Sequence, residues 1–253
     1  MKVRILGCGT STGVPKIGND WGKCDPNEPR NYRLRSSILV ESGDARVLVD
    51  CGPDLRQQLL AACVGRIDAV IVTHDHGDHV HGIDELRPLS QAIDRPVPVY
   101  SDEETLESLR GRFAYAFSQT EFYRPIVEGR VLDELQLGDA TMRFVEQPHG
   151  TTKSLGLRFD EGGKSVAYAI DFSSLTDDMI QLYEGVDVWI ADCLTRTPHP
   201  THAHLDGVLS AARDLRAGQV YLTHMGNGLD YGTLVAELPD WAAPAHDGLE
   251  ISL

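Results

Sequence analysis

The segment Thr-His-Asp-His-Gly-Asp-His at residues 73–79 constrains this chain more than any other feature. It follows directly on the apolar run Ala-Val-Ile-Val, which is typical of a buried strand. Residues two apart in an extended chain point the same way, so His74 and His76 can offer their imidazoles to one metal ion. Asp78 and His79 follow the bend at the glycine, and their different direction suits a second ion about 3.5 to 4 Å away.

Further metal ligands are expected from other strand ends. His149, Asp171 and His224 each follow a predicted strand, and strand ends on one edge of a rigid sheet scaffold can converge in space. Taken alone, each has an ordinary alternative role, such as a hydrogen-bonded histidine or an aspartate in a turn. The segment at residues 73–79 could equally be read as a polar turn, but three histidines and two aspartates in six residues favour metal ligation.

The order of predicted elements indicates an α/β protein. Short β-branched runs at Val3–Leu6, Ile38–Glu41, Val47–Asp50, Ala69–Thr73 and Val97–Tyr100 alternate with helical patterns that begin near Leu55 and Ile83. A second series has strands at Thr141–Val145, Ser154–Phe159, Val166–Ile170, Val186–Ala191 and Gln219–Thr223, and a helix over Leu205–Leu215. Two similar halves of this kind predict two sheets packed face to face with helices outside, and we expect one domain over residues 1–253.

Composition limits the kinds of binding partner and the cellular compartment that we expect for this protein. The chain has 23 Lys and Arg against 38 Asp and Glu, a net charge of −15, which disfavours nucleic acids and anionic membranes as partners. No apolar run approaches the roughly 18 residues of a membrane span, and the first residues lack a secretory hydrophobic region. Five scattered cysteines predict neither a disulfide framework nor a cysteine zinc site, so we expect a cytoplasmic protein.

The pattern His74-x-His76-x-Asp78-His79, followed by His149, Asp171 and His224 in that order, resembles the metallo-β-lactamase superfamily over nearly the whole chain. The resemblance implies an αββα sandwich with two divalent ions at one edge. It also implies the ligands: His74, His76 and His149 for the first ion, Asp78, His79 and His224 for the second, and Asp171 between them. Asp50 matches the aspartate that supports these ligands.

In that family the two ions generate a bridging hydroxide that attacks the substrate, which makes Asp78 and Asp171 catalytic residues as well as ligands. Imidazole-rich ligation suits Zn²⁺, while the carboxylates leave Mn²⁺ or Fe²⁺ open.

The resemblance narrows to the phosphodiesterase branch, and especially to the PhnP type, which opens a cyclic phosphate on ribose. The His-x-Asp motif before a helix in that branch matches His204-Leu205-Asp206, so the resemblance implies His204 as the general acid. His199 and His202 share the same loop. Arg33 and Arg35 lie on one side of an extended segment and could hold phosphate in bidentate geometry, although a solvated strand edge explains them equally well.

One departure concerns a separate structural zinc that this branch often carries. Only Cys24 is left of the cysteine cluster, and Asn227 stands where a histidine would help, so we predict no third metal site. The predicted substrate is a small phosphodiester, and the chain could form a homodimer. Three alternatives stay open: a tRNA 3′-processing nuclease, a hydrolase of esters, thioesters or lactones on the same metals, and a metal-binding module without catalysis.

Overall fold

The computed structural model describes residues 1–253, and six strands from residues 1–131 form a seven-stranded sheet together with the last strand of the chain. The order across this sheet is β14, β1, β2, β3, β4, β5, β6. The pairs from β14 to β3 are antiparallel and those from β3 to β6 are parallel. The strands are β1 (Lys2–Gly7), β2 (Ser37–Ser42), β3 (Ala45–Val49), β4 (Ala69–Ile71), β5 (Val97–Ser101), β6 (Val127–Val131) and β14 (Glu250–Ser252).

The second sheet also has seven strands, in the order β13, β12, β11, β10, β9, β8, β7. Hairpins make β7 to β10 antiparallel, and β10 to β13 run parallel. Its strands are β7 (Leu135–Leu137), β8 (Ala140–His149), β9 (Thr152–Glu161), β10 (Lys164–Ala169), β11 (Val188–Asp192), β12 (Gln219–Thr223) and β13 (Ala242–Pro244).

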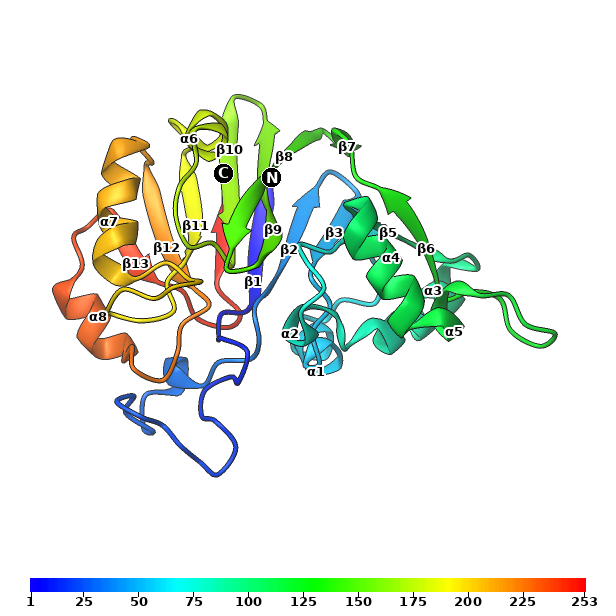
Figure 1. Ribbon diagram of the computed structural model, residues 1–253, viewed down its shortest axis with the longest axis horizontal. Coiled ribbons are helices and arrows are strands. Elements are labelled where there is room, and N and C mark those ends of the chain that lie inside the picture. The colour runs from blue at the N-terminus through cyan, green and yellow to red at the C-terminus, as the bar shows by residue number, and fades with distance from the viewer.

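Helices cover the outer face of each sheet, so the molecule has four layers (Figure 1). The first sheet is covered by α1 (Leu55–Ala61), α3 (Arg87–Ile93), α4 (Glu103–Arg112) and α5 (Ala114–Phe117). The second sheet is covered by α6 (Asp177–Tyr183), α7 (Leu205–Asp214) and α8 (Tyr231–Glu237). Short turns of helix complete the set: η1 (Pro29–Asn31), α2 (Gly77–Val80) and η2 (Ile83–Leu86).

The alternation of side chains along each strand divides the core. Ile38 and Val40 of β2 pack in a cluster of 41 buried residues that fills the space between the sheets and continues beneath the helices of the second sheet. Leu39 packs in a cluster of 20 beneath the helices of the first sheet. Both faces of the central strands are therefore buried, which explains their nearly continuous apolar sequences. This arrangement confirms the predicted αββα sandwich. None of the helices combines the length and apolar character that a membrane-spanning segment requires.

The predicted strands are present, with different ends in several cases. The predicted helix from Ile83 to Ile93 is divided in two, because η2 gives way to α3 at Arg87 and Pro88 occupies the first turn of α3. Sequence reasoning missed β6, β7, β13 and β14, which lie at or next to the sheet edges.

Candidate metal centre

Both halves of the chain bring candidate ligands to one edge between the sheets. His74 and His76 lie in the loop after β4, and Asp78 and His79 lie in the first turn of α2. His149 is the last residue of β8. Asp171 and His224 follow the ends of β10 and β12. All seven predicted ligands therefore meet at one place.

Three residues of this edge have left-handed backbone conformations. The φ angles are 64° at Asp50, 52° at Asp171 and 56° at His224. Residues with a Cβ rarely adopt such angles, which cost about 1 to 3 kcal/mol each and persist only where surrounding contacts hold them. Each of the three residues follows the end of a strand, so the turn redirects its side chain toward the space between the sheets.

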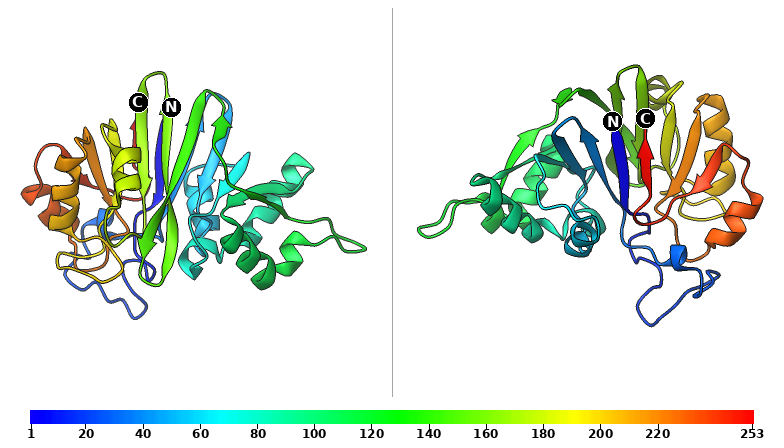
Figure 2. Two further views of the ribbon diagram at one scale, coloured as in Figure 1. Left: turned by 45° about the horizontal axis from the view of Figure 1, so that its top comes forward. Right: turned by 180° about the vertical axis from the view of Figure 1, so that it is seen from behind.

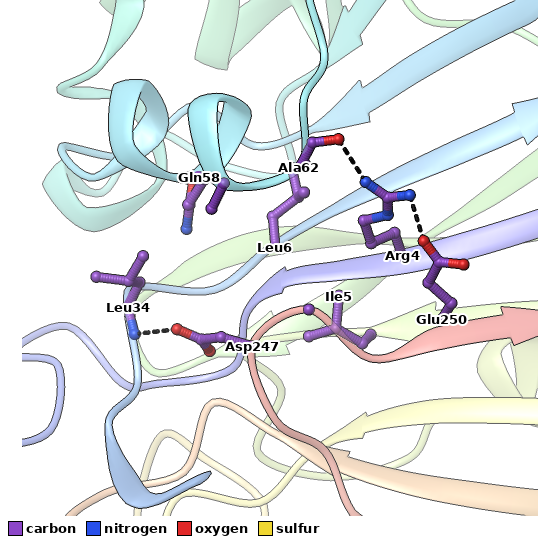
Figure 3. Close-up of a pocket in the computed structure, with 10 residues that line it drawn as sticks. Arg4, Ile5, Leu6, Leu34, Gln58, Ala62, Asp247 and Glu250 are labelled. Atoms are coloured by element: carbon purple, nitrogen blue, oxygen red, sulfur yellow. Dashed lines mark hydrogen bonds and ion pairs between the residues drawn. The ribbon is translucent and has the colours of Figure 1, made fainter. Parts of the chain in front are cut away.

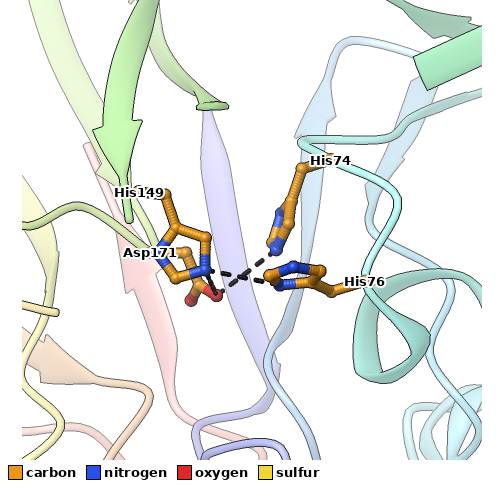
Figure 4. Close-up of side chains that lie close together, drawn as sticks. All are labelled: His74, His76, His149 and Asp171. Carbon is orange, nitrogen blue, oxygen red and sulfur yellow. Dashed lines mark hydrogen bonds and ion pairs between the residues drawn. The ribbon is translucent and has the colours of Figure 1, made fainter. Parts of the chain in front are cut away.

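The first cluster consists of His74, His76, His149 and Asp171 (Figure 4). His76 Nδ1 lies 3.3 Å from His149 Nε2. Asp171 Oδ2 lies 3.4 Å from both His74 Nε2 and His149 Nε2. A tetrahedral zinc ion with ligand bonds of about 2.05 Å has ligand–ligand distances of about 3.3 Å. The spacing of these atoms therefore fits one metal ion.

A second cluster adjoins the first and contains Asp78, His79 and His224. Asp78 Oδ2 lies 3.3 Å from His79 Nε2. The Asp171 carboxylate reaches this cluster too, with Oδ2 at 3.7 Å from His79 Nε2 and Oδ1 at 3.3 Å from His224 Nδ1. Asp171 thus lies between the two sets of ligands, where a carboxylate can face two cations.

Hydrogen bonds fix which imidazole nitrogen faces the centre. His79 Nδ1 donates to Asp50 Oδ2 at 2.7 Å, and His149 Nδ1 donates to the carbonyl of Thr201 at 2.8 Å. Asp50 also accepts from the backbone N–H and hydroxyl of Thr73. Both histidines therefore present Nε2 to the clusters, in the arrangement of metal-binding histidines whose other nitrogen is held by the protein.

Electrostatics favour the protonation states that bind cations. Burial lowers the pKa of both His149 and His224 to about 4, so both imidazoles are neutral at pH 7. Burial raises the pKa of Asp171, but the nearby His224, His79 and His74 lower it more, and the pKa falls well below its ordinary value. Neutral imidazoles and an ionised carboxylate are the forms that bind a divalent ion.

Three buried polar atoms of these clusters have no hydrogen-bond partner: His74 Nε2, His79 Nε2 and Asp171 Oδ1. Buried polar atoms are rarely left without a partner, and each such atom calls for an explanation. All three belong to the ligand clusters, and their donor types are those that Zn²⁺ and Mn²⁺ accept. The residues present therefore fit divalent cations.

A cavity of about 240 Å³ opens onto the clusters. None of its lining residues is hydrophobic. They are Ser11, His76, Asp78, His149, Gly150, Thr151, Thr152, Asp171, Thr201, His202 and His224.

His202 lines the cavity, whereas the sequence analysis named it only as a neighbour of His204 in the same loop. Its Nδ1 donates to Asp192 Oδ2 at 2.9 Å, and its ring stacks on His224 with centroids 5.1 Å apart. Burial lowers the pKa of His202, but the hydrogen bond to Asp192 and the negative charges of Asp192, Asp171 and Asp78 together raise it above its ordinary value. His202 also lies near enough to Asp171 and His224 to form a third ligand set, but Asp192 already occupies its Nδ1.

The structure places His204 differently from the prediction. His204 precedes α7 as its N-cap and does not line the cavity. Its ring packs beside Gly207, where a Cβ would come within 2.9 Å of it. In an extended segment His202 and His204, two residues apart, would point the same way, but the ring of His204 lies against α7 instead. The geometry therefore favours His202 as the histidine that can reach a substrate.

Arg33 is buried and does not lie on the solvated strand edge that the sequence analysis considered for it. It is 1% exposed, and its guanidinium donates to the carbonyls of Gly226 and Leu229 and to Asn31 Oδ1. A side chain buried to this degree, which does not line the cavity, is poorly placed to contact a substrate phosphate. Arg33 instead ties the loop after His224 to the segment before β2.

Arg35 lies closer to the surface and to the cavity. Its guanidinium pairs with Asp54 at 3.0 Å and donates to the carbonyl of Ser11, a residue that lines the cavity. Near Arg33, Cys24 Sγ lies 3.5 Å from the carbonyls of Asn227 and Leu229. Hydrogen bonds thus connect the segment around Cys24 to the loop after β12.

A separate cavity of about 280 Å³ lies between α1 and the end of the chain (Figure 3). Its charged groups already have partners: Arg4 donates to Glu250 and to the carbonyl of Ala62, and Asp247 accepts from the backbone N–H of Leu34. It contains no histidine, so we do not take it as the catalytic site.

One signal for His202 was present in the sequence. Asp192 is the last residue of β11, and Asp171 follows the neighbouring strand β10. If the argument from strand ends had been applied to every strand, it would have included Asp192 as a candidate. Its partner could not be read in the same way, because residues 193–201 form an irregular loop whose path brings His202 back to Asp192.

Comparisons with known proteins agree with this geometry. Residues 45–225 match the family described as Beta-lactamase superfamily domain. A solved structure of a new diphosphatase from the PhnP family is 37% identical with a TM-score of 0.90, and the match covers 99% of this chain and 96% of that chain.

Curated relatives extend the comparison. The probable metallo-hydrolase YhfI of Bacillus subtilis is 25% identical over 236 residues, 89% of this chain and 87% of the relative. An octanoyltransferase of Porphyromonas gingivalis is 29% identical over 257 residues, 99% of this chain, but this chain spans only 51% of that relative. The resemblance predicted from the histidine and aspartate pattern is confirmed, and the chain belongs to the β-lactamase superfamily as one of its metal-dependent hydrolases.

Proposed function

We propose that this protein is a dinuclear metal-dependent phosphodiesterase that hydrolyses a small or cyclic phosphodiester, such as a ribose cyclic phosphate. The observation that carries the proposal is the Asp192–His202 pair at a cavity bordered by two ligand clusters. His74, His76 and His149 would hold one ion, Asp78, His79 and His224 the other, and Asp171 both. Zn²⁺ or Mn²⁺ suits these donors, and Fe²⁺ is compatible with them.

When bound, two such ions supply a water of lowered pKa and a clamp for the oxygens of an in-line displacement. The protein contributes the proton for the leaving group. Asp192 orients His202 and raises its pKa, so the imidazolium persists to higher pH and can donate a proton to an oxygen in the cavity. In this proposal His202 takes the general-acid role that the family resemblance implied for His204.

The identity of the leaving group follows from this proton donor. An alkoxide that leaves a phosphodiester is strongly basic and needs a proton, whereas a leaving phosphate, whose second pKa is about 6, needs little help. A histidine held by a buried carboxylate therefore favours a phosphodiester over a diphosphate. Diphosphate hydrolysis is the second candidate, because a relative 37% identical to this chain is a PhnP-family diphosphatase.

The surroundings of the cavity favour a small substrate. Its volume, about 240 Å³, lies below the range of about 300 to 1,000 Å³ typical of drug-sized ligands. A neighbouring cavity of about 460 Å³ shares Thr152 with it and is lined by five carboxylates and one lysine: Asp75, Asp102, Glu103, Glu104, Glu146 and Lys153. An acidic wall of this kind repels a polyanion such as tRNA.

Three further expectations from the sequence stand as proposals. We propose a single domain over residues 1–253, because strands from both ends of the chain share the first sheet, and a cytoplasmic location, because five free cysteines form no disulfide framework. Arg35 is proposed to steady the rim of the cavity through the carbonyl of Ser11, and through that contact to support substrate binding.

The test is hydrolysis by protein stripped of metal and then loaded with Zn²⁺, Mn²⁺ or Fe²⁺, with metal content measured in the same samples. The substrates are a ribose cyclic phosphate, a linear alkyl phosphodiester, a nucleoside diphosphate, a lactone and a thioester. We expect turnover of phosphodiesters that depends on metal, with the greatest loss in a ligand variant, His76→Ala. The surface histidine variant His81→Ala serves as the matched control.

Two results would contradict the proposal. Turnover of lactones or thioesters without phosphodiesters would establish the carboxylic ester alternative. No turnover of any substrate by protein that holds two ions per chain would favour a metal-binding module without catalysis.

A further inference from the structure

The first sheet ends in an edge strand that nothing covers along its outer side. β6 pairs only with β5, and it has five residues, whereas β7, β13 and β14 have three each. Figure 1 shows β6 as the outermost strand of its sheet. An uncovered edge offers unpaired backbone groups to another strand, and natural proteins usually protect such edges.

The hydrogen bonds of β6 fix which residues face outward. The carbonyl of Ile126 accepts from Val97, and the N–H of Leu132 donates to Ser101, so the even-numbered residues bond to β5. Because backbone groups alternate in direction along a strand, the N–H and C=O groups of Val127, Gly129 and Val131 face away from the sheet.

The side chains of β6 also divide between two faces. A Cβ built at Gly129 would meet Arg110 and Leu106 of α4 and Phe117 of α5, so Val127, Gly129 and Val131 point toward the helices. Glu128 and Arg130 point to the opposite face, where both are exposed and form an ion pair of 2.8 Å.

From these observations we propose that two copies of this chain associate through β6, paired antiparallel about a two-fold axis at Gly129. The sequence Val-Glu-Gly-Arg-Val is self-complementary in that register. Val127 lies opposite the partner's Val131, and Glu128 lies opposite the partner's Arg130. The outward N–H and C=O groups of residues 127, 129 and 131 face the outward groups of residues 131, 129 and 127 in the other copy. Such residues form the hydrogen-bonded pairs of an antiparallel ladder.

Charge complementarity favours a second copy of this chain, and not another protein, as the partner of the β6 edge. An antiparallel pair of this register places Glu128 of each copy beside Arg130 of the other, so the interface contains this ion pair twice. Opposite charges directly across strands stabilise pairing, and like charges oppose it. An edge protected against pairing would more often carry charges of one sign, such as lysines.

Exposed apolar side chains gather around the same edge. Of nine large hydrophobic residues exposed on the molecule, four lie near β6: Tyr115, Phe122, Tyr123 and Val131. The loop from α5 to β6, which carries Phe122 at 79% and Tyr123 at 67% exposure, projects away from the rest of the molecule in both views of Figure 2. A cavity of about 390 Å³ lies beside Val127, on the face where the partner's Val131 would pack.

The experiment is sedimentation equilibrium of the metal-loaded full chain and its charge variants. Wild type is expected to form a dimer. Glu128→Arg and Arg130→Glu each place like charges opposite each other twice, so each variant should weaken the dimer by about tenfold or more. A mixture of the two single variants restores opposite charges at both pairs, and so does the double variant, so both should dimerise again.

The rescue makes the test specific to this register. Both residues are exposed, and the melting temperature of each variant measures whether the fold is intact. A monomeric wild type, a dimer unaffected by the single variants, or a failure of rescue in the mixture would each overturn the proposal. None of these outcomes depends on the proposed hydrolytic activity.

Discussion

Asp50 shows how a single residue outside the ligand clusters controls the centre. It is fully buried, and it joins Thr73, which precedes His74, to His79. Two ligands from different clusters thus depend on one carboxylate. Outer partners of this kind orient metal ligands and increase their basicity.

Replacement of Asp50 by asparagine should weaken metal binding without a change in volume. The amide of Asp50→Asn cannot accept every bond that the carboxylate accepts, so His79 loses its fixed tautomer. We expect a loss of about 10- to 100-fold in the affinity of one ion. Competition with a chromophoric chelator measures it, and the exposed Asp84→Asn is the control. Equal affinity in the two variants would contradict this role of Asp50.

Asp247 supplies a dependence of stability on pH. Its carboxylate accepts from the N–H groups of Cys8 and Leu34, and burial raises its pKa from 3.8 to about 7. Because the folded pKa is raised, the contribution to stability is present below about pH 4 and is lost as the pH rises through 7.

The free energy of unfolding of the metal-free protein should therefore include a decrease between pH 5 and 8 that Asp247→Asn removes. The expected difference is about 2 kcal/mol. Urea denaturation at several pH values measures it, with the exposed Asp240→Asn as control. Parallel pH profiles for wild type and Asp247→Asn would show that this carboxyl is ionised throughout.

At the scale of elements, the sequence predicted the central strands well, because residues buried on both faces are apolar throughout. The edge strands escaped notice for the opposite reason. β6 reads Val-Glu-Gly-Arg-Val, and β14 has only three residues, so neither has an apolar run. Backbone pairing with a neighbour, which no local pattern records, makes these segments strands.

The residues of the candidate site also divide into those that the sequence could predict and those that it could not. His149, Asp171 and His224 could be predicted because each ends or follows a recognisable strand. His202 could not be chosen over His204, because both lie in a loop whose path depends on contacts with Asp192 and Thr195. The burial of Arg33 could not be predicted, because its acceptors are backbone carbonyls nearly 200 residues away in the sequence.

The loop after β12 depends on Arg33, and this predicts a difference between the two neighbouring arginines. Arg33→Met leaves the carbonyls of Gly226 and Leu229 without their donor in the protein interior, and we expect a loss of about 2 to 4 kcal/mol in stability. Arg35→Met removes a partly exposed ion pair and should cost less than about 1 kcal/mol. Chemical denaturation compares them. Equal losses would contradict a structural role specific to Arg33.

At the scale of the whole molecule, charge limits which substrates can approach. The chain carries −15, and two divalent ions would reduce this only to −11. The acidic cavity beside the centre places five carboxylates next to the ligand clusters. This charge distribution supports the proposed small phosphodiester substrate over RNA.

An excess of unprocessed tRNA should leave hydrolysis of a small phosphodiester unchanged at low ionic strength, because repulsion outweighs binding. The rate with and without tRNA at several salt concentrations measures this. Inhibition that weakens steeply with added salt would contradict the prediction and support the tRNA 3′-processing alternative.

The central claim is that His202 protonates an alkoxide leaving group, and two matched variants test it most directly. Hydrolysis of an alkyl phosphodiester and of a p-nitrophenyl phosphodiester, whose leaving group needs no proton, is compared in His202→Ala and His204→Ala. We predict that His202→Ala loses about 10²- to 10⁴-fold on the alkyl ester and far less on the p-nitrophenyl ester, with metal content unchanged. His204→Ala should affect both little. Equal losses on the two esters in His202→Ala, or the selective loss in His204→Ala, would contradict the account.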